Sequence, residues 1–262
     1  MNIFLCSDIN CKPGLLTLVY SLLINNKNSS FYFYICCDDK DNFINELNIL
    51  KNKFTNLNSY KIIEFKNTVF FKNVISKIEL RKEKRLENIF NHARLFLPWI
   101  FTDVNKALYL DCDILVIDDI RELYNLDTTK NVYGVKYKKK SKIINAGVYL
   151  YNVNKYRKRR YKRKLLKYYN NKIKKEESIG PTQKLVNKII KDNLSYVSKI
   201  WNYRQRDRGP HPCNHTAIKN NVKIIHYNGG GAPGPWFTKY ECNDCYTKEW
   251  YKYYNDLKHH FL

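Results

Sequence analysis

The stretch Tyr109-Leu-Asp-Cys-Asp-Ile-Leu-Val116 places two carboxylates, Asp111 and Asp113, directly after an apolar run that predicts a strand. Carboxylates at a strand end can hold a divalent cation. A second stretch, His226-Tyr-Asn-Gly-Gly-Gly-Ala-Pro-Gly-Pro-Trp236, follows another apolar run and adds an imidazole and a series of backbone amides. Together these groups form a receptor for a metal-bound pyrophosphate, which indicates an enzyme that uses sugar nucleotides.

Outward from this stretch, apolar runs alternate with longer segments of helical periodicity. The apolar runs lie at residues 2–7, 31–37, 60–65 and 106–110, and the helical segments include 14–26, 40–54 and 86–101. This alternation predicts an α/β fold of βαβ units, with a mainly parallel central sheet flanked by helices. Ligands bind beyond the carboxyl ends of such strands, and Asp8 and the Asp111/Asp113 pair follow strand ends.

No clear linker separates the second half of the chain from the first. The sequence of the second half predicts a short helix over 119–124, strands near 131–137 and 146–151, a basic helix from about 154 to 170 and a final aromatic helix over 247–261. The segment 204–216, rich in Gly, Pro, Arg and His, indicates an irregular loop. Because 262 residues suit one α/β domain, we expect residues 1–262 to form a single domain.

The formal charge of +23 at pH 7 favours anionic partners, such as phosphorylated donors, anionic membrane surfaces or nucleic acid. The abundance of Lys, Asn, Ile and Tyr also matches an A/T-rich coding sequence, so part of the charge carries no information about a partner. The basic run Lys155 to Lys164 predicts a solvated helix face, with peripheral contact to an anionic membrane as the alternative. Nucleic acid is not expected as a partner.

The N-terminal segment Met1 to Asp8 lacks the basic start, the long apolar run and the cleavage site of a signal peptide, and predicts a first strand. No segment is apolar for the length that a membrane helix needs. We therefore expect a cytoplasmic protein, with at most peripheral contact to a membrane surface.

Eight cysteines in a chain of this kind favour free thiols over disulfides. Cys6, Cys36, Cys37 and Cys112 lie in apolar runs, where cysteine packs as a small hydrophobe. One further set leaves two alternatives open, a structural zinc site or free surface thiols. Its members are Cys213, His215, Cys242 and Cys245.

Five motifs follow one another along the chain. They are Cys6-Ser-Asp-Ile-Asn-Cys11, His92-Ala-Arg-Leu95, Tyr109-Leu-Asp-Cys-Asp113, Asn145-Ala-Gly-Val148 and His226-Tyr-Asn-Gly229. In this order they resemble the family 8 glycosyltransferases, the group that includes glycogenin and bacterial lipopolysaccharide galactosyltransferases. The resemblance implies the Rossmann-like GT-A fold of nucleotide-diphospho-sugar transferases. It also implies a metal-dependent enzyme that transfers a hexose, of the glucose or galactose type, from a UDP-sugar to a hydroxyl acceptor with retention.

The resemblance assigns roles to individual residues. The metal, Mn²⁺ or Mg²⁺, would be bound by Asp111, Asp113 and His226. Asp8 and Asn10 would contact the uridine, and Gln183 would lie near the anomeric carbon. The residues expected to contact the donor are Cys6, Asp8, Asn10, Cys11, Arg94, Asp111, Cys112, Asp113, Gly229 and Gly230. Those expected to act in catalysis are Arg94, Asn145 and Gln183.

Departures from the family pattern concern the sugar and the base. Cys11 stands where relatives have a tyrosine that stacks on uracil, and Thr182-Gln-Lys184 replaces an Asp-Gln-Asp group. Lys136-Tyr-Lys138 and Gly234-Pro-Trp236 also replace motifs that carry other charges. These changes keep one alternative open, a catalytically degenerate scaffold that acts as a basic binding protein. The acceptor of an active enzyme would be a glycan, a lipid-linked or a protein hydroxyl.

Overall fold

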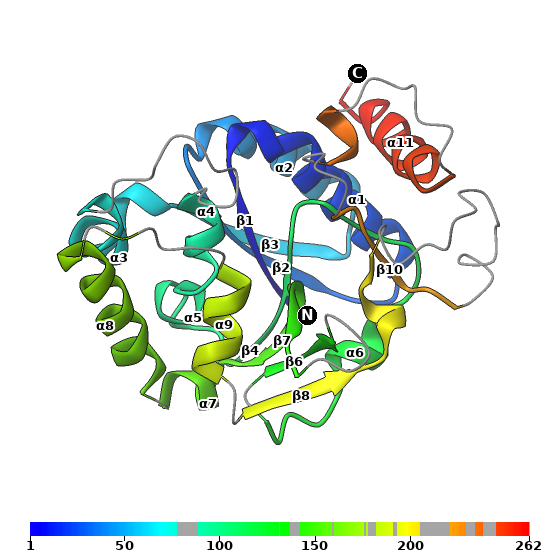
Figure 1. Ribbon diagram of the computed structural model, residues 1–262. Coiled ribbons are helices and arrows are strands. Elements are labelled where there is room, and N and C mark those ends of the chain that lie inside the picture. Colours follow the sequence, from blue (N-terminus) through cyan, green and yellow to red (C-terminus); the bar gives the residue numbers. More distant parts are fainter. Residues whose placement is uncertain are drawn as a thin grey trace.

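The computed structural model describes residues 1–77, 89–130, 132–136, 142–158, 160–175, 177, 182–190, 193–204, 221–228, 234–237 and 245–261. A seven-stranded sheet forms the middle layer, and helices cover both of its faces (Figure 1). Each face buries its own cluster of hydrophobic side chains. The α/β architecture predicted from the alternation of apolar and helical segments is therefore confirmed.

The large sheet has the strand order β3-β2-β1-β4-β7-β6-β8. Its strands are β1 (Asn2–Ser7), β2 (Phe31–Cys37), β3 (Leu57–Glu64), β4 (Lys106–Leu110), β6 (Val132–Lys136), β7 (Ile144–Asn152) and β8 (Leu194–Val197). All pairs are parallel except those of β7, which runs antiparallel to β4 and β6. Because β7 is reversed, its first residues lie beside the carboxyl end of β4.

A second, three-stranded sheet follows directly from β4. It consists of β5 (Ile114–Val116), β10 (Ile224–His226) and β9 (Tyr203–Arg204), in the order β5-β10-β9. β10 pairs antiparallel with β5, with His226 opposite Ile114, and parallel with β9. This small sheet brings a late part of the chain to the segment that joins β4 to β5.

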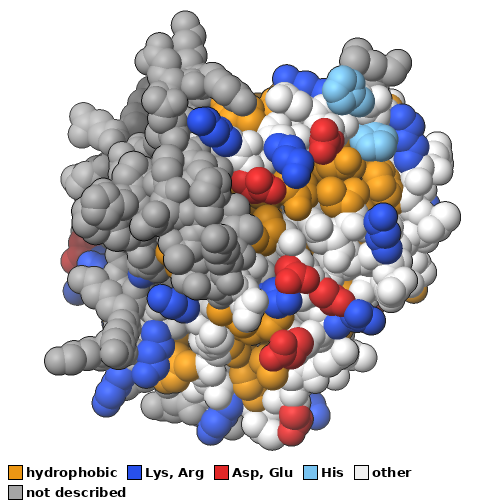
Figure 2. Space-filling model, turned by 90° about the vertical axis from the view of Figure 1, so that its right-hand side faces the viewer, with side chains coloured by type: hydrophobic (Ala, Val, Ile, Leu, Met, Phe, Trp, Pro, Cys, Tyr) orange, Lys and Arg blue, Asp and Glu red, His pale blue; other side chains and the backbone are white. Residues whose placement is uncertain are grey.

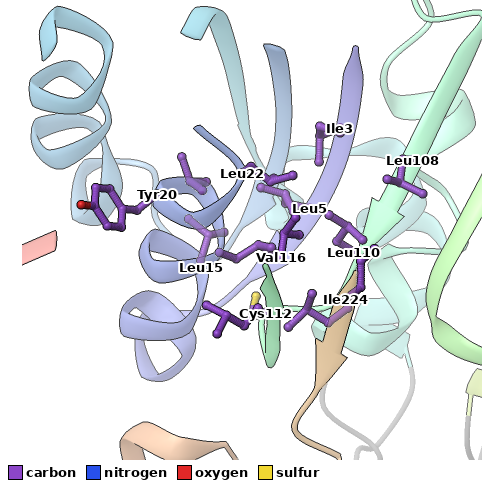
Figure 3. Close-up of a cluster of buried hydrophobic side chains, with 14 of the residues drawn as sticks. Ile3, Leu5, Leu15, Tyr20, Leu22, Leu108, Leu110, Cys112, Val116 and Ile224 are labelled. Atoms are coloured by element: carbon purple, nitrogen blue, oxygen red, sulfur yellow. The ribbon is translucent and has the colours of Figure 1, made fainter. Parts of the chain in front are cut away.

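One face of the large sheet is covered by α1 (Lys12–Asn25) and α2 (Asp41–Lys53), and α11 (Cys245–Lys258) packs on the outer side of α1. Ten consecutive residues of α1, Gly14 to Leu23, are buried, as expected for a helix enclosed on all sides. The side chains of α1 meet those of β1, β4, β5 and β10, as Figure 3 shows for Leu15, Leu5, Leu110 and Ile224. In α11, Trp250 is fully buried and Tyr253 nearly so, so these aromatics cover the core.

The other face is covered by short helices and by α8 (Tyr161–Lys174) and α9 (Thr182–Ile190). The short helices on this face are α3 (Val69–Asn73), α4 (Ile89–Ala93), α5 (Leu97–Ile100) and α7 (Val153–Lys158). A further short helix, α6 (Arg121–Tyr124), packs instead with the hydrophobic cluster that contains α1. The exposed side of α8 is basic. The side of the molecule that lies at the right of Figure 1 is mixed in charge, because Figure 2 shows acidic side chains there among the basic ones. No helix in the described part of the chain combines the length and the apolar character that crossing a bilayer requires.

Two expected helices are each divided. The helix predicted over 86–101 is wrong, because α4 ends at Ala93 and α5 begins at Leu97. Pro98 has no N–H to continue a helix and suits the first turn of a new one. The basic helix predicted over 154–170 is likewise α7 followed by α8. An unbroken helix would carry Arg160, four residues after the buried Tyr156, toward the core, and the break brings Tyr161 there instead.

Candidate functional site

The candidate site lies where the strand order of the large sheet reverses direction, between β1 and β4. These two strands are parallel neighbours, so their carboxyl ends lie side by side. β1 is followed by Asp8, and β4 is followed by Asp111 and Asp113. Open α/β sheets bind ligands at such a switch point.

Asp111, Asp113 and His226 form a cluster in which one ligand atom of each residue lies within 4.8 Å of the others. Nε2 of His226 is 3.1 Å from Oδ1 of Asp113 and 4.0 Å from Oδ2 of Asp111. The pairing of β10 with β5 produces this approach, and the N–H of Tyr227 donates to the carbonyl of Asp113 at 2.8 Å. Carboxylates combined with one imidazole are a donor set that suits Mn²⁺ or Mg²⁺, so these three residues could hold such an ion.

The imidazole of His226 lies against Gly147 of β7. A Cβ atom at position 147 would stand 2.8 Å from Nδ1 and 2.9 Å from Nε2, closer than real Cβ contacts. The carbonyl of Gly147 also accepts the N–H of Asp111 at 2.9 Å. The glycine therefore provides the space for the ring, and its backbone ties β7 to the first carboxylate.

Arg94 follows α4 and is paired with Asp111. Its Nη1 is 2.8 Å from Oδ1 and 3.1 Å from Oδ2 of that carboxylate, and donates to the carbonyl of Ala146 at 3.0 Å. The hydroxyl of Tyr109 donates to Asp111 Oδ1 at 2.6 Å. Burial would lower the pKa of Arg94, but the attraction of Asp111, together with smaller contributions from Tyr109, Tyr149 and Cys6, holds that pKa well above its usual value. Arg94 thus stays charged beside the cluster, where its expected contact with a donor remains a prediction.

The carboxyl group of Asp113 is also held in its charged form. Burial would raise its pKa, but the charge and the hydrogen bond of His226, together with the charge of Arg94, leave the pKa below its usual value. An ionised carboxylate is the form that binds a cation.

Asn145 and Gln183, both expected to act in catalysis, are in contact. Gln183 lies in the first turn of α9, and its Oε1 accepts from Nδ2 of Asn145 and from the N–H of Ala146, both at 3.3 Å. Asn145 and Gly147 both lie in β7, and Gly147 contacts Asp111 and His226, so this strand connects Asn145 to the carboxylate cluster. The structure therefore brings these sequence-predicted residues together.

Asn202 joins this group, although sequence reasoning missed it. It follows η6 (Lys199–Trp201), is 1 % exposed, and its Nδ2 donates to Oδ1 of Asn145 at 2.9 Å. Its Oδ1 lies 2.9 Å from Nδ1 of His226. No spacing in the sequence indicates this contact, because the two-residue strand β9 carries Asn202 to β10 across more than twenty positions.

The residues expected around the uridine lie at the other end of the site. Asp8 caps η1 (Ile9–Cys11) by accepting the N–H of Cys11 at 3.0 Å. The carbonyl of Asn10 accepts Nε1–H of Trp236 at 2.8 Å, in η8 (Pro235–Phe237). The indole of Trp236 also covers Gly14 so closely that a Cβ there would collide with it. The segments of Asn10 and Trp236, which are far apart in the sequence and are both expected to bind the donor, are therefore in direct contact.

The cysteines of the described segments behave as the sequence predicts. Cys6 and Cys112 are buried, and the Sγ of Cys112 donates to the carbonyl of Cys6 at 2.9 Å. A donor at this site would therefore meet their backbone rather than their side chains. Cys11 is half-buried. Burial is the main cause that raises the pKa of its thiol, which is therefore protonated at neutral pH. Free thiols are seen at Cys6, Cys11, Cys36, Cys37 and Cys112.

Some expected residues lie outside the part of the chain that the structure describes. They are Gly229 and Gly230 of the expected phosphate loop, Lys138, and three members of the alternative zinc set, Cys213, His215 and Cys242. Cys245 begins α11. The phosphate loop and the zinc alternative therefore remain predictions.

Comparisons with known proteins agree with this geometry. The family model described as "Glycosyl transferase family 8" matches residues 2–239. "Probable galacturonosyltransferase-like 4" of Arabidopsis thaliana is 26 % identical over 272 residues, which cover 89 % of this chain and 73 % of that protein. "Galactinol synthase 2" of the same plant is 26 % identical over 212 residues, 64 % of this chain and 58 % of that protein.

Solved structures have the same fold. The crystal structure of galactosyltransferase LgtC in complex with donor and acceptor sugar analogs superposes with a TM-score of 0.71, at 18 % identity, over 98 % of this chain and 96 % of that one. The GT-A architecture expected from the resemblance is thereby confirmed. Since the family model spans almost all of the sequence, the chain belongs to glycosyl transferase family 8.

Proposed function

We propose that the protein is a retaining glycosyltransferase that moves a hexose, of the glucose or galactose type, from a UDP-sugar to a hydroxyl group. The observation that carries the proposal is the convergence of Asp111, Asp113 and His226 at the switch point of a family 8 chain. Nucleotides bind at this place in open α/β sheets. The acceptor would be a glycan, a lipid-linked or a protein hydroxyl.

The cluster would hold Mn²⁺ or Mg²⁺, and the imidazole favours Mn²⁺. When bound there, the ion would act as a Lewis acid toward the diphosphate that leaves the sugar. Arg94 adds a fixed positive charge next to Asp111, and the amides of Gly229 and Gly230 would donate to the diphosphate oxygens. The chain would thereby place positive charge and hydrogen-bond donors where negative charge develops.

Gln183 would orient the sugar rather than attack it. Its Oε1 is engaged by Asn145 and by the backbone of Ala146, so the amide presents Nε2, which has no lone pair for a nucleophilic role. We therefore infer a front-face displacement in which the acceptor hydroxyl attacks from the side on which the diphosphate leaves. The departing phosphate oxygen would accept the proton of that hydroxyl.

The test is to incubate the purified protein with Mn²⁺ and a panel of UDP- and GDP-sugars, and to measure thermal stabilisation and the release of nucleoside diphosphate. The expected result is stabilisation and slow hydrolysis with one UDP-sugar, both of which disappear when EDTA removes the metal. Product anomers, determined by NMR with an accepted sugar acceptor, would then test retention. No response to any donor, together with strong binding to polyanions, would favour the degenerate basic binding protein instead.

A further inference from the structure

Four side chains form one hydrogen-bonded row that ends at the expected metal site. From Gln183 the row passes through Asn145 and Asn202 to Nδ1 of His226, with separations of 3.3, 2.9 and 2.9 Å. Asn145, Asn202 and His226 are at most 3 % exposed, so water does not supply alternative partners. The other nitrogen of the ring, Nε2, faces Asp113 at 3.1 Å.

The backbone fixes the direction of every hydrogen bond in this row. The N–H of Gly147 donates to Oδ1 of Asn145 at 3.0 Å, and a backbone N–H is always a donor, so this atom of Asn145 must be the oxygen. The same oxygen receives Asn202, which must therefore turn its NH₂ group toward Asn145. The carbonyl oxygen of Asn202 is left facing Nδ1 of His226. An oxygen accepts, so Nδ1 must carry the proton.

The reverse arrangement is costly in a buried row. If Asn202 turned its amide around, its oxygen would face that of Asn145 at 2.9 Å, with no donor between them. Oδ1 of Asn145 would keep only the N–H of Gly147. A buried polar group without its partner is strongly disfavoured.

A second amide agrees with a proton on Nδ1. Nδ2 of Asn228 lies 3.2 Å from Nδ1 of His226, while Oδ1 of Asn228 is buried and has no hydrogen-bond partner among the described residues. Amide oxygen and nitrogen are exchanged by a half-turn of the group. That half-turn would place the oxygen of Asn228 against the same N–H and satisfy it.

We propose that Asn202, oriented by Asn145 and the backbone of Gly147, is a positioning residue that keeps the proton of His226 on Nδ1. When Nε2 releases the proton that it shares with Asp113, its lone pair is directed toward Asp111 and Asp113, which is the form of the imidazole that binds a metal. The inference deepens the proposed function, because it explains how one ligand of the metal is held in its binding form. It assigns Asn202 a role in metal affinity rather than in contact with the substrate.

The first test needs no variant. NMR of the metal-free protein labelled with ¹⁵N-histidine distinguishes Nδ1–H from Nε2–H through long-range couplings, and the loss of one signal set in His226→Gln assigns it. The expected result is a proton on Nδ1 of His226, whether or not Nε2 also carries one. A neutral ring with bare Nδ1 and protonated Nε2 would overturn the proposal. This outcome does not depend on turnover, so it is separate from a failure of the proposed function.

The second test measures Mn²⁺ affinity by calorimetry in Asn202→Leu, Asn202→Asp and a control. Loss of the acceptor in Asn202→Leu should weaken Mn²⁺ binding by about 10–100-fold, as for other partners of metal ligands. Asn202→Asp keeps an acceptor for Nδ1–H and should bind more tightly than Asn202→Leu. The control Asn56→Leu removes another buried amide, which donates to two backbone carbonyls at 2.9 and 3.2 Å away from the site.

A purely structural role for Asn202 would lower the melting temperature in Asn202→Leu and in the control alike, with Mn²⁺ affinity unchanged in both. Wild-type affinity in Asn202→Leu would therefore refute the proposal. If no variant folds, the tautomer of His226 in the wild-type protein still decides it.

Discussion

Gly147→Ala is expected to separate metal binding from folding. The added methyl group would lie 2.8 Å from Nδ1 and 2.9 Å from Nε2 of His226, whereas ordinary contacts of a Cβ begin at 3.4 Å. It approaches Cε1 even more closely, so the ring has to move by about 1 Å. Metal ligands are held to within about 0.2 Å of their ideal distances. A displacement of this size would take Nε2 out of coordinating range.

The expected magnitudes follow from this geometry. Overpacking a core position costs about 1–3 kcal/mol of stability, which a domain of this size can tolerate. If the affinity for Mn²⁺ falls about 100-fold, a concentration that was 100 times Kd becomes equal to Kd. The stabilisation by the ion then decreases from about 2.7 to about 0.4 kcal/mol.

The assay compares the rise of Tm on addition of Mn²⁺ in the wild type, in Gly147→Ala and in Gly134→Ala. Gly134 lies in β6 of the same sheet, and a Cβ there would meet Cδ1, Cβ and Cγ2 of the buried Ile144 at 2.8, 3.1 and 3.2 Å, away from the ring of His226. Gly134→Ala should lose stability and keep the full response to Mn²⁺. An undiminished response in Gly147→Ala would refute the assignment of His226 as a ligand held against β7.

Three further changes test other parts of the structure. Asp113→Asn should reduce metal-dependent turnover by at least about 100-fold with an unchanged circular dichroism spectrum, and wild-type rates would contradict the metal site. Burial, and then the charge of Arg94, lower the pKa of His92 to about 4. The stability that neutral His92 supports should thus be complete above pH 6.5 and decrease by about 3 kcal/mol toward pH 4, a loss that denaturant titrations should find reduced in His92→Phe. Replacing the exposed Arg160 and Arg163 by Ala should weaken binding to phosphatidylserine vesicles by about 1 kcal/mol per residue while donor hydrolysis stays the same. Equal vesicle binding would exclude α8 as a membrane contact.

The strands and the carboxylate pair were predictable because their signals are local. Four consecutive apolar residues, Ile3 to Cys6 ahead of Asp8 and Ala107 to Leu110 ahead of Asp111, suffice to mark a buried strand and its end. The helix breaks were less accessible. Apolar residues continue at helical spacing through Leu95 and Phe96, and only Pro98 indicates that a new helix begins there.

The surroundings of His226 could not be derived from the sequence for a different reason. Gly147 and Asn202 reach the ring through strand pairings of few residues, between β4 and β7 and between β9 and β10. Short strands carry little periodicity, so neither the register nor the partner is fixed by the local pattern. A lone glycine or a lone asparagine carries no sign of the side chain that it will meet.

The pairing of β5 with β10 determines when the carboxylate and imidazole cluster can exist at all. Ile114 and His226 are neighbours in space but roughly 110 residues apart along the chain. During synthesis the N-terminal part emerges first, and Asp111 and Asp113 lack His226 until β10 has left the ribosome. A cation therefore cannot act as a template for the early folding of the large sheet. Tight binding of a cation by this cluster would instead indicate that the chain from β1 to β10 has been synthesised and folded.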